Sequence, residues 1–210
     1  MEIRYFNRGQ QQIEVEKVYG VKAVIWLYTT GLGKLLQRLL STAPISMIYG
    51  IFQDMYASHK KIIPFVKEFN LDLGDFLPEE GRSSNDPYSS FNNFFIRRFK
   101  AGKRRFVTDK NTMPAFCEAR YFGYAKTGPE VKVPVKGKFL DAKSLLAHDN
   151  WNQIFDQGPL LLARLCPVDY HRYHFPLDGK IIESYALHGK YHSVNPVALK
   201  ERPDIFATNE

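Results

Sequence analysis

The sequence predicts an α+β protein, because two patterns follow one another along its 210 residues. Up to about residue 104, apolar residues recur at the three- and four-residue spacing of helices. From about residue 105 onward, short runs of β-forming residues alternate with turns that contain glycine or proline. We therefore divide the chain into a helical region, 1–104, and a β-rich region, 105–210. Alternation along several short strands favours a compact antiparallel or barrel-like β domain.

The helical region is expected to contain four longer helices and a short one. They are expected at residues 21–30, 32–41, 44–59 and 60–68, and from residue 90 onward. Gly31 and Gly33 separate the first two, and Pro64 suits the first turn of the fourth. Ser90 offers an N-cap to the short helix. The apolar face of that helix would consist of Phe91, Phe94, Phe95 and Phe99.

The β-rich region is expected to contain five short strands. They are expected at residues 119–125, 131–135, 159–165, 171–175 and 180–187. Turn pairs such as Asp178-Gly179 and His188-Gly189 separate them, and one helical stretch at 141–155 interrupts them. Residues 72–86 are acidic and rich in glycine, proline and serine, so they are expected to form a loop.

The charge balance points to an anionic partner, because the formal net charge is +7 and the pI is near 9.3. Nucleic acid, anionic lipid and acidic small molecules all fit that balance, and so does a solvated basic face. No nucleic-acid-binding module is recognisable, so nucleic acid is the weakest of these partners. The chain has two cysteines, Cys117 and Cys166, without metal-ligand spacing, which favours a reducing compartment.

The helix expected at 32–41 is amphipathic. Its leucines recur at helical spacing, and Lys34, Gln37 and Arg38 lie on the other side. A basic helix of this kind can lie in a membrane interface, or its leucines can pack on the protein's own core. No window reaches the roughly 18 uninterrupted apolar residues of a spanning helix, and the first residues do not form a signal peptide.

The residues that indicate chemistry cluster in the sequence Cys-Pro-Val-Asp-Tyr-His-Arg-Tyr-His-Phe-Pro at 166–176. Imidazole can give and take a proton near neutral pH, and this stretch places His171 and His174 beside Asp169 and Arg172. On a strand, His171 and His174 would face opposite sides and could have separate roles. Glu118 precedes an expected strand and could orient an imidazole as the acid of a triad, or form a surface ion pair.

Two other kinds of catalytic site compete with this interpretation. His188 and His192, together with His171 and His174, could form the metal site of a hydrolase, although Gly189 argues against one helix presenting the second pair. The chain contains no Gly-x-Ser-x-Gly, no P-loop and no dinucleotide-binding glycine pattern. A classical serine hydrolase or a nucleotide enzyme is therefore unsupported.

From these residues the chain resembles the phosphatidylserine decarboxylases. The stretch Pro-Val-Asp-Tyr-His-Arg-Tyr-His-Phe-Pro at 167–176, followed by Asp-Gly-Lys-Ile at 178–181, resembles the histidine motif of that family. Phe-Asn-Asn-Phe-Phe-Ile-Arg-Arg at 91–98 is similar to its Phe-Asn-x-Phe-Phe-x-Arg segment. Residues 191–195 and 206–210 resemble its Ser-Val-Asn and Phe-x-x-Asn-Glu-Arg segments. The resemblance covers roughly residues 85 to 210, in order.

The resemblance implies a proenzyme that cuts itself at a Gly-Ser bond, after which the new terminal serine becomes a pyruvoyl group. This cofactor forms a Schiff base with phosphatidylserine, and phosphatidylethanolamine and carbon dioxide are the products. By position, His174 would be the base of self-cleavage, Glu118 its triad acid, and His171 the donor that reprotonates the substrate carbon. Candidate substrate-binding residues are Ser193, Tyr170 and Asn195.

The resemblance also implies partners and a location. The N-terminal helices would dock the protein peripherally on an anionic membrane surface, at the cytoplasmic face, where its substrate phospholipid lies. The pyruvoyl-bearing C-terminal segment would be a further partner, and a homodimer is left open. Nucleic acid and metal are not implied.

Two departures from the family pattern matter. The triad acid is normally Asp, and here either Glu118 or, in a register anchored on Met113-Pro114, Phe116 occupies its position. We prefer Glu118, because Ala-Arg follows it. None of the 14 glycines is followed by serine, so we expect the domain to be incomplete at its C-terminal side and active only if the missing segment is supplied. The alternative is a non-catalytic membrane lipid-binding module.

Overall fold

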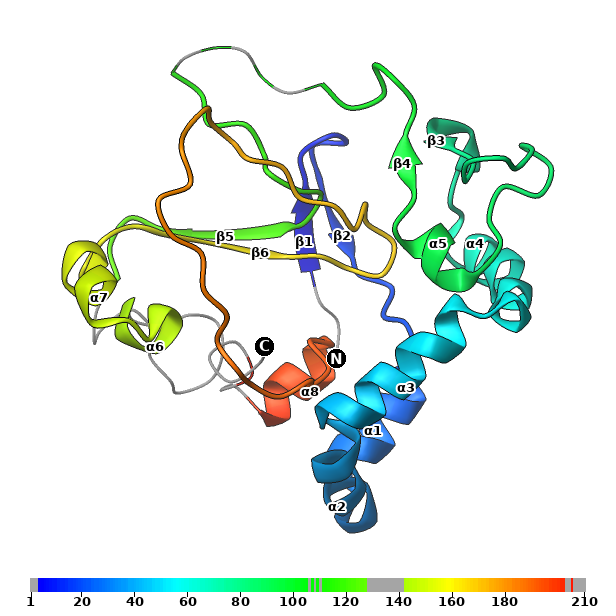
Figure 1. Cartoon of the computed structure of the whole chain (residues 1–210), viewed down its shortest axis with the longest axis horizontal. Helices are drawn as coiled ribbons and strands as arrows, with labels where there is room; N and C mark the ends of the chain where they lie inside the picture. The colour runs from blue at the N-terminus through cyan, green and yellow to red at the C-terminus, as the bar shows by residue number, and fades with distance from the viewer. Residues whose placement is uncertain are drawn as a thin grey trace. The chain divides into compact units, whose positions relative to one another are not determined.

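The protein combines helices with short strands, which confirms the predicted α+β class (Figure 1). The computed structural model describes residues 4–105, 107, 109, 111–127, 142–202 and 205. The chain forms two compact units. Unit 1 contains Met1–Ser46, Tyr121–Leu162 and Ser184–Glu210, and unit 2 contains Met47–Arg120 and Ala163–Glu183. Each unit thus draws on sequence from both sides of residue 104, and the division into regions 1–104 and 105–210 stays a prediction.

The first described element of unit 1 is an antiparallel hairpin that was not predicted from the sequence. Its strands are β1 (Arg4–Asn7) and β2 (Gln12–Val15), with Arg4 opposite Val15. The helices that follow are α1 (Val21–Thr29) and α2 (Gly31–Leu40). Further along the chain the unit contains α6 (Ala142–Leu146), α7 (Asp149–Phe155), α8 (Pro196–Glu201) and most of the sheet of β5 (Arg120–Tyr124) and β6 (Leu160–Arg164).

Helices α1 and α2 approach closely at a glycine. Thr30 caps α2, because its Oγ1 accepts a hydrogen bond of 3.0 Å from the Gly33 N–H. A Cβ at Gly33 would collide with the Trp26 carbonyl oxygen and lie 2.8 Å from the Leu27 Cα. The absence of a side chain at this position therefore permits the tight turn. Tyr28 of α1 then packs with Ala198 and Ile205 in the core of unit 1.

Unit 2 contains the larger apolar core, formed by Ile62, Phe65, Tyr88 and Phe94. Its elements are most of α3 (Ala43–Asp54), the 3-10 helices η1 (Tyr56–Lys61) and η2 (Leu73–Asp75), α4 (Ile62–Phe69), β3 (Phe76–Leu77), α5 (Phe91–Phe95) and β4 (Arg98–Phe99). Strands β3 and β4 are antiparallel, with Phe76 opposite Phe99. The Ser90 Oγ accepts from the Asn93 N–H at 3.1 Å, so the predicted N-cap of the short helix is confirmed.

Two predicted strands and one residue of a predicted helix face differ in the structure. Residues 171–175 and 180–187 form no strand, because the described residues offer their backbone no ladder partner. Phe99 does not continue the face of the short helix, because α5 ends at Phe95 and Phe99 lies on β4. The strand predicted at 131–135 lies outside the described residues. The described strands form three two-stranded sheets, and no closed barrel is present among them.

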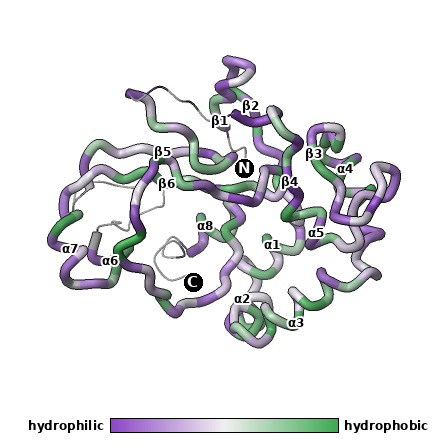
Figure 2. Tube along the Cα trace, turned by 45° about the horizontal axis from the view of Figure 1, so that its top comes forward, coloured by the Kyte–Doolittle hydropathy of each residue, from purple (hydrophilic) through white to green (hydrophobic). Residues whose placement is uncertain are grey.

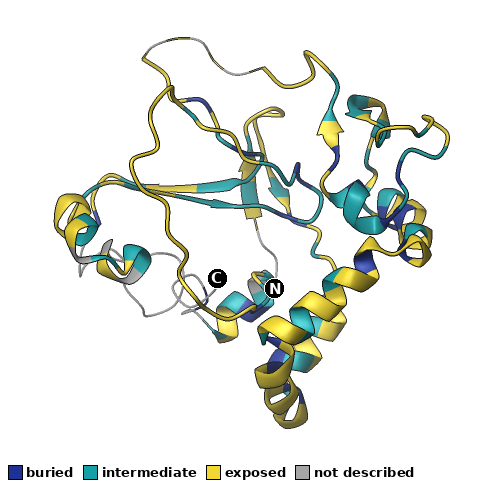
Figure 3. Cartoon of the chain, in the orientation of Figure 1, coloured by how far each residue is buried: buried dark blue, intermediate teal, exposed yellow. Residues whose placement is uncertain are grey.

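Apolar side chains run along α2 and α3 and are largely open to solvent (Figures 2 and 3). Within the described residues, no single helix is both long and apolar enough to cross a membrane. Helices α2 and α3 reach the required length and composition only when taken together, as a sharply bent pair.

Candidate functional site

The predicted reaction cluster lies in unit 2, on a loop that we call the histidine loop, residues 166–174. It follows strand β6 and begins with a β-turn, in which the Asp169 N–H donates to the Cys166 carbonyl at 2.9 Å. Pro167 occupies the second turn position, where its fixed φ is favourable. This turn, followed by a 2.9 Å bond from the Arg172 N–H to the Tyr170 carbonyl, replaces the strand that the sequence predicted.

Asp169 holds the turn together. Its Oδ2 accepts from the Cys166 N–H at 2.7 Å, and its Oδ1 lies 3.0 Å from Nη1 of Arg120. Burial raises the pKa of the Asp169 carboxyl, and the Cys166 hydrogen bond and the Arg120 charge oppose that rise. The carboxylate that the sequence placed in the reaction cluster is thus occupied in fixing the loop.

Arg97 anchors the histidine loop to α5. Its side chain is only 2% exposed, and its guanidinium lies against the rings of Phe76 and Phe94, at 4.5 and 4.9 Å from their centroids. Nη2 donates to the carbonyls of Val168 and Asp169, at 2.8 and 3.2 Å. Burial lowers the pKa of Arg97, although nearby acidic groups oppose this. Nothing in the sequence singled out this residue as the anchor, beyond its place after the Phe-rich helix.

His171 is held in one orientation and one tautomer. Its ring stacks on Phe95, with centroids 3.9 Å apart, and its Nε2 lies 2.8 Å from the Cys166 carbonyl oxygen. A carbonyl can only accept, so Nε2 carries the proton. Burial lowers the pKa of His171 from its usual 6.5, and the Arg97 charge adds to that shift. At neutral pH the ring is therefore uncharged, and Nδ1 is an unprotonated acceptor without a hydrogen-bond partner among the described residues.

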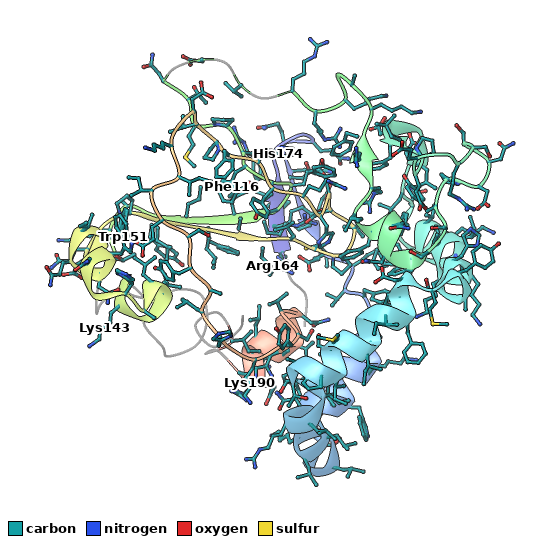
Figure 4. The ribbon with its side chains drawn as sticks, viewed as in Figure 1. Phe116, Lys143, Trp151, Arg164, His174 and Lys190 are labelled. Carbon is teal, nitrogen blue, oxygen red and sulfur yellow. The ribbon has the colours of Figure 1, made fainter. Side chains whose placement is uncertain are left out.

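His174 has different contacts from His171. Its backbone N–H donates to the Phe116 carbonyl at 2.7 Å, and Figure 4 shows the two residues side by side. Its ring stacks nearly parallel to that of Tyr170, at 5.8 Å between centroids. The His174 side chain is exposed, whereas Tyr170 is buried and also contacts Phe99. The two histidines thus occupy different environments, which is compatible with separate roles.

Glu118 contacts the histidine loop directly. Its Oε2 accepts from the Tyr170 N–H at 3.1 Å, and its Oε1 lies 2.6 Å from Nε of Arg104. The competing position, Phe116, is a phenylalanine whose backbone carbonyl accepts from the His174 N–H. Glu118 is therefore the position of the two that brings a carboxylate to the loop, and its role as triad acid stays a prediction.

The remaining predicted residues lie in unit 1. Asn195 is the N-cap of α8, since its Oδ1 accepts from the Val197 N–H at 3.0 Å, and its Nδ2 donates to the Tyr19 carbonyl at 3.2 Å. Ser193 accepts from the Asn195 N–H and donates its own N–H to the Tyr28 hydroxyl at 3.1 Å. Asn195 thus has a structural part that its place in a motif did not reveal.

The metal-site alternative gains no support. Throughout the part of the chain that the structure describes, no group of three or more His, Cys, Asp or Glu side chains is placed to hold a metal ion. Cys117 and Cys166 are both buried and free of disulfide bonds.

Comparison with known proteins identifies the family. Residues 91–210 match the family model described as phosphatidylserine decarboxylase. The chain is 35% identical over 209 residues to a phosphatidylserine decarboxylase proenzyme of Clostridium botulinum (strain Hall), a match that covers 99% of this chain and 69% of the relative. Proenzymes of the same name from Ruminiclostridium cellulolyticum and Clostridium tetani are 35% and 32% identical, each over 99% of this chain and 68% of the relative. With 57% of its length inside the family model and these relatives along nearly all of it, the chain belongs to the phosphatidylserine decarboxylase family of carboxy-lyases.

Proposed function

We propose that this chain takes part in converting phosphatidylserine to phosphatidylethanolamine and carbon dioxide. Its family supports this reaction class, and the environment of His171 is the observation that carries the proposal. A decarboxylation leaves a carbanion that must be protonated. A fixed, half-buried imidazole with one hydrogen-bonded nitrogen and one free nitrogen suits that task. The free nitrogen, Nδ1, would take up a proton from solvent and deliver it to the substrate carbon, which supplies the one proton that the reaction consumes.

A pyruvoyl group would supply the electrophilic carbonyl that withdraws the electrons released with carbon dioxide. The residues present fit such a group, because His171 is kept uncharged by burial and its Nδ1 has no other described partner. None of the 210 residues forms a Gly-Ser pair, so we propose that the group is carried by a further segment. In self-cleavage, His174 would accept the proton of the cleaving serine, with Glu118 as the acid that orients the imidazole.

An exposed apolar surface in unit 2 supports the need for that segment. Tyr173, Phe175, Leu177, Ile181 and Ile182 are between 66% and 83% exposed. The run has no strand partner in the described part of unit 2, so it offers both backbone groups and apolar side chains to a partner segment. We propose that the pyruvoyl-bearing segment covers it.

The substrate is a membrane lipid, and α2 would bring the protein to it. Leu32, Leu35 and Leu39 are 57–64% exposed, and Lys34 and Arg38 lie on the same helix. Leucines can enter the acyl boundary while lysine and arginine bind anionic head groups. We propose a peripheral protein at the cytoplasmic face of a membrane, with Ser193 near the phosphoserine head group.

The test joins this chain to the portion of the Ruminiclostridium relative that the match does not cover. On vesicles that contain phosphatidylserine, the joined protein should cut itself, carry a pyruvoyl group by mass spectrometry, and release phosphatidylethanolamine. His171→Ala should still cut itself but lose more than about a hundredfold in turnover, because it lacks the general acid. Product formed by the 210 residues alone would refute the pyruvoyl proposal, and so would a joined protein that carries the group and makes no product.

A second function is favoured by the exposed leucines of α2. The chain could be a lipid-binding module without catalysis. In that case the chain would sediment with anionic vesicles, while the joined protein would neither cut itself nor release product.

A further inference from the structure

Helix α2 exposes its leucines and buries the side that carries Gly33 and Gln37, which is unusual for a helix of a globular protein. Its leucines face solvent, whereas Gly33, Gln37 and Ser41 at its C-cap, each four residues after the last, are buried. Gln37 is 5% exposed and Ser41 is 4% exposed. A surface helix normally buries its apolar stripe and exposes its polar face. Lys34 and Arg38 of the same helix stay exposed, but the buried polar groups of Gln37 and Ser41 must have partners that offset their burial.

These partners are three consecutive residues of one segment. The Tyr191 N–H donates to the Ser41 carbonyl at 3.0 Å, and Gln37 Nε2 lies 2.6 Å from His192 Nδ1. The Ser193 N–H donates to the Tyr28 hydroxyl at 3.1 Å. We call this row of bonds the polar seam. All of it lies within unit 1.

The centre of the seam is buried, although Tyr191 at one end is exposed. Tyr28 is 2% exposed and His192 is 8% exposed. Burial raises the pKa of the Tyr28 hydroxyl, and hydrogen bonds from Ser193 and Gln37 oppose that rise, so Gln37 contacts both Tyr28 and His192. Because an amide nitrogen can only donate, His192 Nδ1 accepts and is unprotonated. Buried polar networks of this kind specify one arrangement of the groups they join.

We propose that α2 is a two-faced coupling helix, in which the leucine face binds a lipid surface and the polar seam holds residues 191–193 in their working position. Gln37 is then a positioning residue for the segment that carries Ser193. The proposal rests on the membrane docking and the head-group role proposed above. A lipid surface that binds the leucines reduces the motion of α2. Because the seam bonds join α2 to residues 191–193, this favours the hydrogen-bonded arrangement of those residues.

The first experiment measures amide hydrogen exchange of the chain with and without vesicles of phosphatidylserine and phosphatidylcholine. Vesicles should slow exchange at Tyr191 and Ser193 by about fivefold, the effect of strengthening one buried hydrogen bond each. If the chain binds vesicles and these amides exchange as before, the coupling is refuted while the docking stands. If the chain does not bind vesicles, both proposals fall.

The second experiment separates the seam from the fold. Gln37→Leu should bind vesicles as well as the unmodified chain, because the leucine face is intact, but its Tyr191 and Ser193 amides should exchange about fivefold faster and no longer respond to vesicles. Gln153→Leu is the matched control, since Gln153 is an exposed glutamine on α7 of the same unit. It should behave like the unmodified chain.

Gln37→Glu tests the chemistry of the seam. A carboxylate can accept from His192 Nδ1–H after a change of tautomer, so this variant should recover the vesicle response that Gln37→Leu loses. In the joined enzyme, Gln37→Leu should raise KM for phosphatidylserine vesicles about fivefold and leave kcat within about twofold, because the seam positions the substrate and leaves the reacting atoms untouched. A Gln37→Leu protein that matches Gln153→Leu in both exchange and KM would overturn the assignment.

Discussion

Arg97 shows how much of the histidine loop depends on one buried side chain. Its guanidinium lies between two phenylalanine rings and binds two successive carbonyls of the loop, Val168 and Asp169. The same loop is tied by Asp169 to Arg120 and by Glu118 to the Tyr170 N–H. These charged groups hold the histidine loop in position, whereas Nδ1 of His171 has no hydrogen-bond partner among the described residues.

Arg97→Lys should therefore destabilise the protein despite keeping the charge. A lysine cannot span the two carbonyls or stack between the rings, so the free energy of unfolding should fall by roughly 3 kcal/mol. Urea unfolding followed by fluorescence measures this change. Arg98→Lys is the control, because the exposed Arg98 side chain makes no hydrogen bond or ion pair with a described residue, and it should change stability by less than about 0.5 kcal/mol.

The lowered pKa of His171 predicts a pH-dependent stability. Between its folded pKa and its ordinary value of 6.5, the unfolded chain binds a proton that the folded chain does not. The contribution is complete above 6.5 and is lost as the pH falls toward the folded pKa. The free energy of unfolding should thus fall more steeply from about pH 7 to about pH 5 in the unmodified chain than in His171→Gln. Equal slopes in the two proteins would show that the ring is not buried in its neutral form.

At the residue scale, the sequence predicted which side chains gather at the candidate site, but it predicted their individual contacts less well. The histidines, Glu118 and Tyr170 were predicted, and they meet on one loop of unit 2. Asp169 was assigned to the reaction cluster, but it binds the turn, because a sequence does not show which backbone N–H a carboxylate will meet. The sequence places Gln37 on the polar side of its helix beside Lys34 and Arg38, and no pattern shows that Gln37 alone of these three is buried.

Helices were predicted better than strands for a physical reason. Periodicity along one segment shows an amphipathic helix, so the positions of α1, α2, α4 and α5 were anticipated within a few residues. A strand also needs a partner, which lies elsewhere in the sequence. Residues 180–187 have the composition of a strand, and the described residues provide none to pair with it.

The α1–α2 connection provides a test at the scale of elements. Gly33→Ala would push a Cβ into the Trp26 carbonyl, which is backbone and cannot move aside, so stability should fall by about 1–3 kcal/mol. Gly31→Ala on the same helix meets nothing within 4 Å and should be neutral or stabilising by about 0.5 kcal/mol. Thermal unfolding compares the two variants. A stable Gly33→Ala protein would mean that α1 and α2 are further apart than described.

At the scale of the whole molecule, the chain combines a net charge of +7 with an apolar helix face that is exposed to solvent. The two features favour different parts of one lipid surface, because the charge attracts anionic head groups over a distance and the leucines act only on contact. Both features fit the membrane docking that we propose.

Binding to anionic vesicles should therefore have two components. Raising sodium chloride from about 0.05 M to about 0.5 M should weaken binding by roughly tenfold, because the Debye length shortens, and a remainder carried by the leucines should persist. Sedimentation with vesicles at each salt concentration measures both parts. Vesicles of zwitterionic phosphatidylcholine, which carry no net charge, are the control and should show only the binding carried by the leucines. Binding that ignores both salt and lipid charge would contradict the electrostatic part.

The turn at Cys166 has a consequence for the electronic character of the site. The Cys166 carbonyl oxygen accepts from both the Asp169 N–H and the His171 Nε2–H. A single peptide group therefore fixes the bend of the chain and the tautomer of the His171 ring. The basic lone pair of the imidazole is assigned to Nδ1 by a proline-initiated bend four residues upstream. A substitution at Pro167 that rotated this peptide would remove the acceptor for Nε2–H and let the proton move to Nδ1. The ¹⁵N chemical shifts of the His171 ring would show this change of tautomer without any substrate present.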